Sequence, residues 1–393
     1  MASKVFRKLQ VVKITPSFRE AVKLVEVPLN PPNADEVRVK NVYAGVNAMA
    51  SKVFRKLQVV KITPSFREAV KLVEVPLNPP NADEVRVKNV YAGVNASDVN
   101  VTSARYFTDG KCPYDLGMEA LGVIDAIGSN VTTNLKVGQP VLIADSKPQG
   151  FAEYLYKPLK TLVPLPEVKP NYIVSYVNGL TASIALDKAG RIQPGDKVLI
   201  TAAAGGTGQI AVQWAKKRGC YVIGTTSSEE KAQFVKDLGA DEVINYKKEN
   251  LDQVLKEKFP SGVDVIWETI GGEVFATLFR HLAVKGRMVI IGSTTTYTGD
   301  GNFDVPISKL NAKLLMSSKS LNGFMMTNYT SDYKEYLGKL IGMIAKGELS
   351  AKVDLGENSP GGKFTGLKQT VRAEEWLHSG KNSGKVVVQV NDF

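Results

Sequence analysis

Short runs of alternating apolar and polar residues dominate the region from Leu57 to about Pro170. Runs rich in β-branched side chains, such as 84–91 and 121–128, are separated by turns that contain Pro, Gly and Asn. Runs of this length are typical of strands, and turns at this spacing connect neighbouring antiparallel strands. The pattern predicts a small, mostly antiparallel β domain.

The pattern changes at about Tyr172. From there, apolar strands alternate with segments in which apolar residues recur at helical spacing. We expect strands at 197–201, 221–225, 263–268 and 287–292, and helices at 208–218 and 229–238. This alternation predicts a doubly wound parallel sheet, so the expected fold class is α/β.

The C-terminal region returns to the first pattern. A helical stretch at 333–346 is followed by turns and by an apolar strand at 385–390, which is expected to rejoin the β domain. We therefore predict one β domain made of residues 49–172 and 328–393. A parallel-sheet domain of residues 173–327 is inserted in it, with a cleft between the two.

Residues 1–48 are repeated by residues 49–96 without a single substitution. Two copies of one packed unit normally diverge, so identity indicates a duplicated exon or a very recent duplication. A basic mitochondrial presequence is a further interpretation of the first copy, although the same residues have the pattern of ordinary strands in the second. Because the second copy continues directly into Ser97, we assign it to the fold and expect residues 1–48 to be no part of it.

Composition narrows the class of protein. With 44% hydrophobic and 23% charged residues, the 393-residue chain can bury the cores of two domains. Its net charge of +11 falls to +7 for residues 49–393. Because the basic residues are spread among acidic ones and are not clustered, we expect no nucleic-acid partner and a small anionic ligand instead. The sequence has no apolar run long enough to span a membrane and no secretory signal, so we expect a protein without a membrane partner. Because the C-terminal Ser-Lys-Leu signal is also missing, we expect the cytoplasm as its location, with the peroxisome as the alternative.

Cysteine and histidine are scarce. Cys112 and Cys220 are the two cysteines, which excludes a disulfide framework and a four-cysteine zinc site. The two histidines, His281 and His378, follow apolar helical segments and are interpreted as structural. A Ser-His-Asp hydrolase therefore has no support.

The strongest chemical signal is a glycine-rich turn between a predicted strand and a predicted helix. It reads Thr-Ala-Ala-Ala-Gly-Gly-Thr-Gly-Gln from Thr201 to Gln209. Glycines let a pyrophosphate approach the backbone, and the helix N-terminus offers free N–H groups and a positive dipole end. Glycines also collect in ordinary turns, but the strand–turn–helix context favours a dinucleotide site. The residues predicted to bind it here are Gly205, Gly206, Thr207 and Gly208.

The end of the next strand indicates which dinucleotide binds. An NAD enzyme usually places a carboxylate there, whereas this chain has hydroxyls followed by a lysine in the segment from Thr225 to Lys231. Ser227 and Lys231 suit the 2′-phosphate of NADPH, which we predict as the cofactor. Alternatively, Ser227 or Ser228 caps the following helix, and both roles can coexist.

Four motifs are shared with a known family. They are Gly93-Val-Asn95-Ala-Ser-Asp98, Gly117-Met118-Glu119, the Gly205 turn and Leu238-Gly-Ala-Asp. With them the chain resembles the medium-chain dehydrogenase/reductase superfamily over nearly all of residues 57–390, which implies a GroES-like catalytic domain and an inserted Rossmann domain. In its zinc alcohol dehydrogenases a cysteine and a histidine hold the metal, but here Asn95 and Met118 stand in those places. Since a zinc site needs thiolate or imidazole ligands, we predict no metal, and the chain resembles the quinone and enoyl reductase branch.

Resemblance within this branch rests on Phe151-Ala-Glu-Tyr, Ile244-Asn-Tyr246, Glu268-Thr-Ile-Gly-Gly, Phe364-Thr-Gly-Leu and Gly380-Lys-Asn382-Ser-Gly-Lys. The resemblance implies an enzyme of lipid metabolism that uses NADPH to reduce the conjugated double bond of α,β-unsaturated ketones. Its implied substrates are 15-keto-prostaglandin-like lipids, and its implied oligomeric state is a homodimer. Thr269 stands where serine is usual and Thr327 where asparagine is expected. The implied cofactor contacts are Thr207, Ser227, Lys231, Tyr246, Thr269, Ile291, Tyr297, Phe324 and Asn382.

Reduction of an enone builds negative charge on its carbonyl oxygen, so a hydrogen-bond donor is needed where a metal would otherwise act. Tyr106 is our candidate, because a neutral phenol can donate at physiological pH and related enoyl thioester reductases carry a tyrosine at this spacing. Alternatively, Tyr106 packs beside Phe107 in a loop. Asn95 is expected to complete the catalytic site, chiefly by shaping a cleft that is apolar and slightly basic.

Two other functions are compatible with these residues. A quinone reductase would use the same cofactor geometry without needing a placed acid. A non-catalytic, crystallin-like protein would bind NADPH without turnover. A panel of enones and quinones would separate the three.

Overall fold

The computed structural model describes residues 5–12, 22–28, 52–147, 149–299 and 304–392. The chain forms two compact units, Met1–Ala50 and Ser51–Phe393. In the first unit, β1 (Val5–Val11) and β2 (Val22–Pro28) pair as an antiparallel hairpin.

A seven-stranded sheet carries the β domain that the alternating pattern predicts. Its order is β10-β8-β7-β5-β18-β17, and β9 also pairs with β5. The strands are β5 (Glu84–Gly93), β7 (Glu119–Ile127), β8 (Pro140–Ile143), β9 (Tyr154–Pro158), β10 (Leu162–Pro164), β17 (Val353–Asp354) and β18 (Lys385–Gln389). Because β18 pairs antiparallel with β5, the C-terminal strand rejoins the first sheet, as expected. A smaller sheet has the order β4 (Val70–Pro76), β3 (Val53–Val59), β6 (Tyr114–Asp115).

Between β10 and β17 in the sequence, the chain forms a six-stranded parallel sheet. Its order is β13-β12-β11-β14-β15-β16, which is the order of a doubly wound dinucleotide-binding sheet. The strands are β11 (Lys197–Ile200), β12 (Tyr221–Thr226), β13 (Glu242–Asn245), β14 (Val263–Glu268), β15 (Leu282–Ile290) and β16 (Ser320–Gly323). The predicted α/β class, with a Rossmann sheet inserted in a GroES-like β domain, is confirmed.

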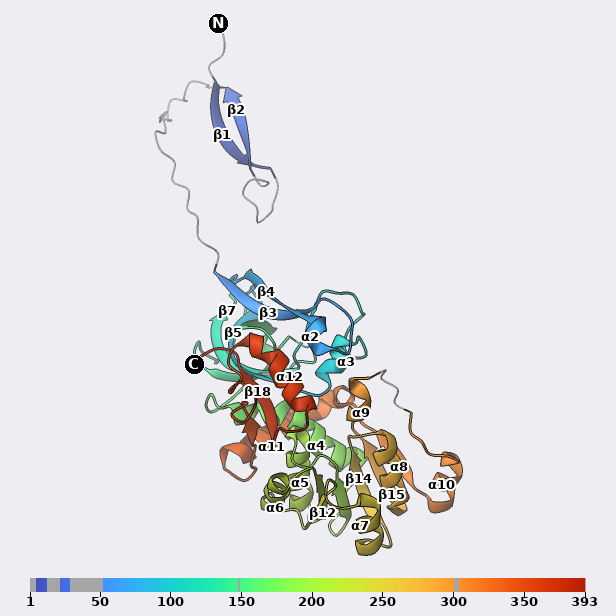
Figure 1. Cartoon of the computed structure of the whole chain (residues 1–393). Coiled ribbons are helices and arrows are strands. Elements are labelled where there is room, and N and C mark those ends of the chain that lie inside the picture. Colours follow the sequence, from blue (N-terminus) through green and yellow to red (C-terminus); the bar gives the residue numbers. More distant parts are fainter. Residues whose placement is uncertain (1–4, 13–21, 29–51, 148, 300–303, 393) are drawn as a thin grey trace. The chain divides into compact units, whose positions relative to one another are not determined.

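Helices cover both faces of the parallel sheet (Figure 1). They are α5 (Gly206–Lys217), α6 (Glu229–Asp237), α7 (Leu251–Lys258) and α8 (Gly272–Arg280). Successive residues of β11 point to opposite faces, so Val198 and Ile200 pack in the cluster that contains α5 and α6, whereas Leu199 packs with α7 and α8. This double burial explains why the strands are continuous apolar runs.

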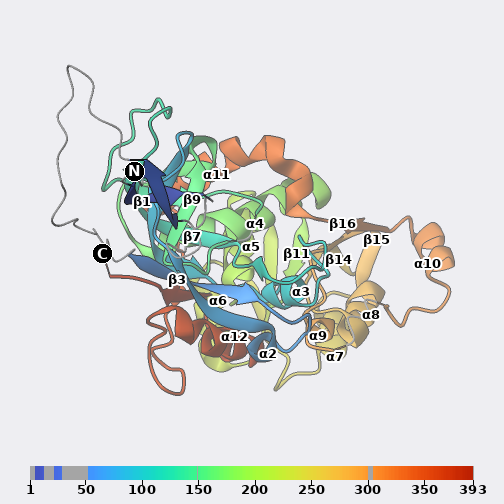
Figure 2. The same ribbon diagram turned by 90° about the horizontal axis from the view of Figure 1, so that it is seen from above.

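The remaining helices connect the sheets. They are α2 (Phe66–Ala69), α3 (Asp98–Thr102), α4 (Thr181–Ile184), α9 (Thr294–Tyr297), α10 (Leu310–Ser317), α11 (Tyr333–Ala345), α12 (Thr370–His378), the 3₁₀ turns η1 (Leu159–Thr161), η2 (Pro170–Ser175), η5 (Met326–Asp332) and η6 (Leu367–Gln369), and the π-helical turns η3 (Tyr176–Leu180) and η4 (Ala185–Ala189). Figure 2 shows α2 and α12 side by side, where Arg67 and Glu375 form a two-pronged ion pair. Within the described ranges, every helix is too short or too polar to cross a bilayer.

Candidate active site

A cavity of about 280 Å³ lies where the two sheets meet. Most of its lining is apolar, and the segments that line it include the β5–α3 connection, the glycine turn, the ends of β14 and β15, and the start of β18. Of the residues predicted from the sequence, it brings together Asn95, Tyr106, Gly205, Gly206, Thr207, Gly208, Thr269, Ile291, Tyr297 and Phe324. Ser227, Lys231, Tyr246 and Asn382 do not line it.

The glycine turn joins β11 to α5, and α5 begins at Gly206, two residues earlier than expected. A Cβ on Gly208 would lie 2.3 Å from the carbonyl oxygen of Ala202, so only glycine fits this close approach. The turn also contacts the C-terminal strand, since the N–H of Gly384 donates to the carbonyl of Ala204 at 2.8 Å. The start of α5 thus lines the cavity as part of a tightly packed loop, and the free N–H groups of a helix N-terminus suit a pyrophosphate.

The segment after β12 separates the two roles that its hydroxyls could play. Ser228 is the N-cap of α6, because its Oγ accepts from the N–H of Lys231 at 3.3 Å. The Lys231 ammonium donates to the carbonyl of Gly380 at 2.6 Å, and burial lowers its pKa. Glu229 turns away to the Asn245 amide at 2.7 Å. Ser227 and Lys231 thus remain side chains that could receive a phosphate, and Asn382 lies close to Gly380 in the chain.

Two threonines form the wall under the ends of β11 and β14. Thr201 Oγ1 and Thr269 Oγ1 lie 2.9 Å apart, and Thr201 also accepts from the Thr269 N–H at 3.0 Å. Beside them Glu268 is buried, and its burial raises its pKa to about 7. The hydroxyl at position 269 is therefore engaged by Thr201.

Tyr106 lines the cavity and also packs edge-on against Phe107, with ring centroids 5.7 Å apart. The side chain therefore packs beside Phe107 and is also accessible from the cavity. The Tyr297 hydroxyl hydrogen-bonds with the Tyr106 hydroxyl and accepts from the N–H of Ser293 at 3.2 Å. Burial raises the pKa of Tyr106, and the hydrogen bond with Tyr297 lowers it by less. Tyr106 is therefore a protonated phenol at neutral pH.

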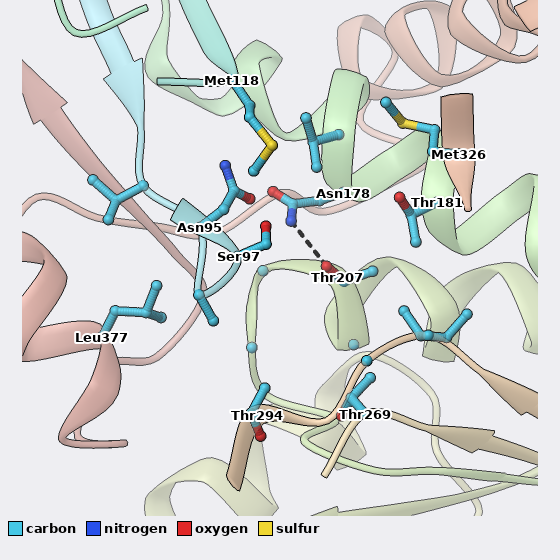
Figure 3. A pocket seen from close by; sticks show the side chains of 18 of the residues that line it. Asn95, Ser97, Met118, Asn178, Thr181, Thr207, Thr269, Thr294, Met326 and Leu377 are labelled. Atoms are coloured by element: carbon cyan, nitrogen blue, oxygen red, sulfur yellow. Dashed lines mark hydrogen bonds between the residues drawn. The ribbon is translucent and has the colours of Figure 1, made fainter. Parts of the chain in front are cut away.

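The positions where zinc ligands would stand hold an amide and a thioether. Figure 3 shows Asn95, Met118 and Asn178 together on one side of the cavity. Among the described residues, no group of three or more His, Cys, Asp or Glu side chains is arranged to hold a metal ion. The Asn95 amide is held instead by Glu119 and Lys385, at 3.0 and 2.6 Å.

Asn178 is a cavity residue that the sequence analysis missed. Its Nδ2 donates to Thr207 Oγ1 at 2.9 Å, the bond drawn in Figure 3. The side chain is 4% exposed, yet its Oδ1 has no hydrogen-bond partner within the described chain. A buried orphan acceptor beside the glycine turn suits a bound polar ligand. In the sequence, only the neighbouring Gly179 marks this position.

The expected charge of the cleft is wrong. The described residues that line the cavity include no lysine and no arginine, and the one carboxylate among them is Asp145. This carboxylate accepts from the buried ammonium of Lys157 at 2.7 Å. The described lining is therefore apolar and not basic.

His281 and His378 lie outside the cavity lining, as expected for structural residues. His281 follows α8 and lies 3.0 Å from Asp252, and His378 ends α12 and lies 3.1 Å from Glu374. Cys112 and Cys220 are both free thiols.

Comparisons with known proteins agree with this architecture. The family model "Alcohol dehydrogenase GroES-like domain" matches residues 81–167, and "Zinc-binding dehydrogenase" matches residues 206–342. The chain is 41% identical to prostaglandin reductase-3 of Mus musculus, over 98% of this chain and 89% of the relative. It is 45% identical to a probable quinone oxidoreductase of Leishmania amazonensis, over 98% of each.

Among solved structures, the Escherichia coli quinone oxidoreductase complexed with NADPH superimposes with a TM-score of 0.73 at 29% identity, over 85% of this chain and 99% of that one. The word zinc in one family description refers to relatives with metal ligands, whereas Asn95 and Met118 replace those ligands here. The chain belongs to the medium-chain dehydrogenase/reductase family, in its zinc-independent, quinone-oxidoreductase-like branch.

Proposed function

We propose that this protein is an NADPH-dependent reductase of the conjugated double bond of α,β-unsaturated ketones, with 15-keto-prostaglandin-like lipids as the substrate class. The observation that carries the proposal is that Tyr106 and the glycine turn line one apolar cavity, in which Asn95 and Met118 occupy the positions of metal ligands. The similarity to prostaglandin reductase-3 supports the substrate class.

NADPH is the proposed cofactor. The glycine turn and the orphan acceptor of Asn178, which both belong to the cavity lining, fit a nucleotide in the cavity. Ser227 and Lys231 would hold the 2′-phosphate, with Tyr246 and Asn382 near the adenosine end. The similar E. coli quinone oxidoreductase was solved with NADPH, which supports the same cofactor here.

Bound NADPH supplies a hydride for the β-carbon of the enone. Negative charge then develops on the carbonyl oxygen, and the chain's own residues must stabilise it. The Tyr106 hydroxyl donates a hydrogen bond to this oxygen while it accepts one from Tyr297. Donors held in fixed positions stabilise the developing charge more strongly than water, which must reorient, does. A proton taken up from solvent at the α-carbon then balances the hydride and completes the saturation of the double bond.

The lining of the cavity suits the apolar part of such a substrate. Met118, Met325 and Met326 are flexible, polarizable side chains that adapt to irregular aliphatic chains. Because the described lining contains no lysine or arginine, a lipid carboxylate would remain outside the cavity in solvent. Binding would therefore depend on the enone and its alkyl chain.

Substitution of Tyr106→Phe tests the proposal. It removes one donor to the carbonyl oxygen, so kcat with enones should fall about 100-fold, while quinone reduction, which needs no placed acid, should change little. Steady-state NADPH oxidation at 340 nm measures both. Tyr114→Phe is the matched control, because the Tyr114 hydroxyl donates to the carbonyl of Val101 and lies outside the cavity lining.

The rival functions predict other outcomes of the same assay. Unchanged turnover of both enones and quinones in Tyr106→Phe would exclude Tyr106 as the donor. A wild type that reduces quinones but no enones would favour a quinone reductase. A wild type that binds NADPH but is silent across enones and quinones would favour the non-catalytic binding protein.

We also propose that the protein is a homodimer, as its resemblance to the family implies. We propose the cytoplasm as its location. β16 is the edge strand of the parallel sheet, and Leu315 and Met316 of the adjoining α10 are exposed. An open edge beside exposed apolar side chains is suited to pairing with a second copy. Sedimentation velocity would measure the mass in solution.

A further inference from the structure

A buried lysine lies directly behind the active-site amide. Lys385 is 2% exposed, and its Nζ lies 2.5 Å from Glu119 Oε2 and 2.6 Å from Asn95 Oδ1. Glu119 is 1% exposed, and its second oxygen accepts from the N–H of Val177 at 3.0 Å. Of the three side chains, Asn95 lines the cavity and the two charged ones do not.

The register of the sheet brings these residues together. Val387 of β18 lies opposite Gly93 of β5, and on the other side of β5 Gly93 lies opposite Glu119 of β7. The antiparallel direction of β18 then brings Lys385, two residues before Val387, to Asn95, two residues after Gly93. Neutral side chains would fill this place at a smaller desolvation penalty, so the ion pair is not explained by stability alone.

Two glycines make room for the ion pair. A Cβ on Gly93 would lie 2.2 Å from Glu119 Oε2 and 2.9 Å from Lys385 Cε, so only glycine fits. On its other side, the Lys385 stem packs against Gly206 of the cofactor turn, where a Cβ would lie 3.2 Å from Cδ. The lysine is thus wedged between the active-site strand and the nucleotide turn.

The two charges fix the orientation of the Asn95 amide. A lysine ammonium has only donors, so it must face Oδ1, and a carboxylate has only acceptors, so it must face Nδ2. Nδ2 gives one hydrogen to Glu119 at 3.0 Å. None of the hydrogen bonds among the described residues uses its second hydrogen. An amide whose oxygen accepts from a cation is also a stronger donor through its nitrogen, because neighbouring hydrogen bonds polarise one another.

Two further carboxyl groups lie near Lys385, but they do not replace Glu119. Burial and the neighbouring Glu374 raise the pKa of Asp98 well above its usual range, and burial also raises that of Glu374. Asp98 accepts from the backbone N–H of Asn95 at 2.9 Å, which holds the backbone of the same residue. The direct ionic partner of Lys385 is therefore Glu119.

We propose that the buried Lys385–Glu119 pair orients and polarises the Asn95 amide, so that its second Nδ2 hydrogen donates to the substrate oxygen on which negative charge develops. Lys385 and Glu119 are then positioning residues, and Asn95 is the second donor beside Tyr106. The proposal rests on the proposed reductase function for the identity of that oxygen.

A double-mutant cycle tests it. The pair is neutralised with Lys385→Met and Glu119→Gln together, which keeps the alkyl stem and leaves no unpaired buried charge. With Asn95 present, kcat for an enone should fall about 10-fold, with KM and the Kd for NADPH within about 2-fold of wild type. In an Asn95→Ala background, the same neutralisation should change kcat by less than about 2-fold, because the residue that transmits the effect is gone.

A matched control neutralises another partly buried pair, Arg287→Met with Asp196→Asn, whose atoms lie 2.6 Å apart away from the cavity lining. It should leave kcat unchanged. Equal losses in both Asn95 backgrounds, or no loss in either, would overturn the proposal. Thermal unfolding of each variant identifies any that fail to fold.

A binding measurement keeps the test independent of turnover. The absorbance of 4-nitrophenolate reports its binding to the NADP⁺ complex, where its charged oxygen mimics the developing enolate. Neutralising the pair should weaken this binding about 10-fold with Asn95 present and little in Asn95→Ala, and equal binding in all variants would overturn the inference. A wild type that holds the phenolate but reduces no enone would overturn the proposed function and leave the inference standing.

Discussion

The two copies of the repeated segment fold into the same hairpin but have different surroundings. β1 and β2 pair Val5 with Pro28, and β3 and β4 pair Val53 with Pro76 in the same register. Leu9 is 57% exposed, whereas its twin Leu57 is 3% exposed. Identical residues therefore reach the same pairing with opposite burial.

The comparison shows that strand pairing is set by residues inside the repeat, whereas burial is set by residues outside it. A hairpin register is set by its own alternation of side chains and by the segment that joins the strands, both of which are identical in the copies. Burial of Leu57 requires residues beyond the repeat, because it packs in a cluster with Phe151 and Phe364. β3 also gains a third strand, β6.

Deletion cannot distinguish the copies, since removing either one leaves the same sequence. Point substitutions at twin positions can. Each of the following substitutions has its twin as an internal control in the same chain.

The largest effect is expected at the buried leucine. Leu57→Ala should lower the free energy of unfolding by about 3 kcal/mol, because it removes buried methyl groups and leaves a cavity. Leu9→Ala should change it by less than about 0.5 kcal/mol, as is usual for exposed positions. Urea denaturation followed by circular dichroism measures both. Similar losses in the two variants would mean that the copies exchange places.

The next effect concerns activity. Asn95→Ala should lower kcat for an enone about 100-fold, the scale of losing one donor to a developing oxyanion. Asn47→Ala, the same substitution in the first copy, should leave kcat at the wild-type value. Steady-state NADPH oxidation measures both, and a loss in Asn47→Ala would contradict the assignment of the second copy to the fold.

The smallest effect is expected at an ion pair. The Lys56 ammonium lies 2.8 Å from Asp115, and both side chains are partly buried. Lys56→Met should lower the free energy of unfolding by about 1 kcal/mol, because Asp115 keeps Gln58 as a donor and stays partly solvated. Lys8→Met should have no measurable effect. The loss should shrink in 1 M NaCl, and a loss independent of salt would indicate packing by the lysine stem instead.

Several site residues could be predicted because each belongs to a short motif with a mechanism. The turn at Gly205 was recognisable from its strand–turn–helix context, and Asn95 and Met118 from the residues they replace. Tyr106 followed from its spacing. Lys385 and Asn178 could not be assigned in this way, because their partners lie elsewhere in the chain; Lys385 is 290 residues from Asn95. The charge of the cavity was also mispredicted, since net charge does not tell where basic side chains point.

By itself, the sequence determined the properties that depend on neighbours in the chain. These are the alternation that forms each hairpin, the apolar strands of the parallel sheet, the glycine turn and the lack of metal ligands at Asn95 and Met118. Only the tertiary structure decided that Leu57 packs with Phe151 and Phe364, and that Lys385 and Glu119 hold the Asn95 amide. The reason is that β18 returns to pair with β5, and this pairing sets contacts between segments that no local pattern relates.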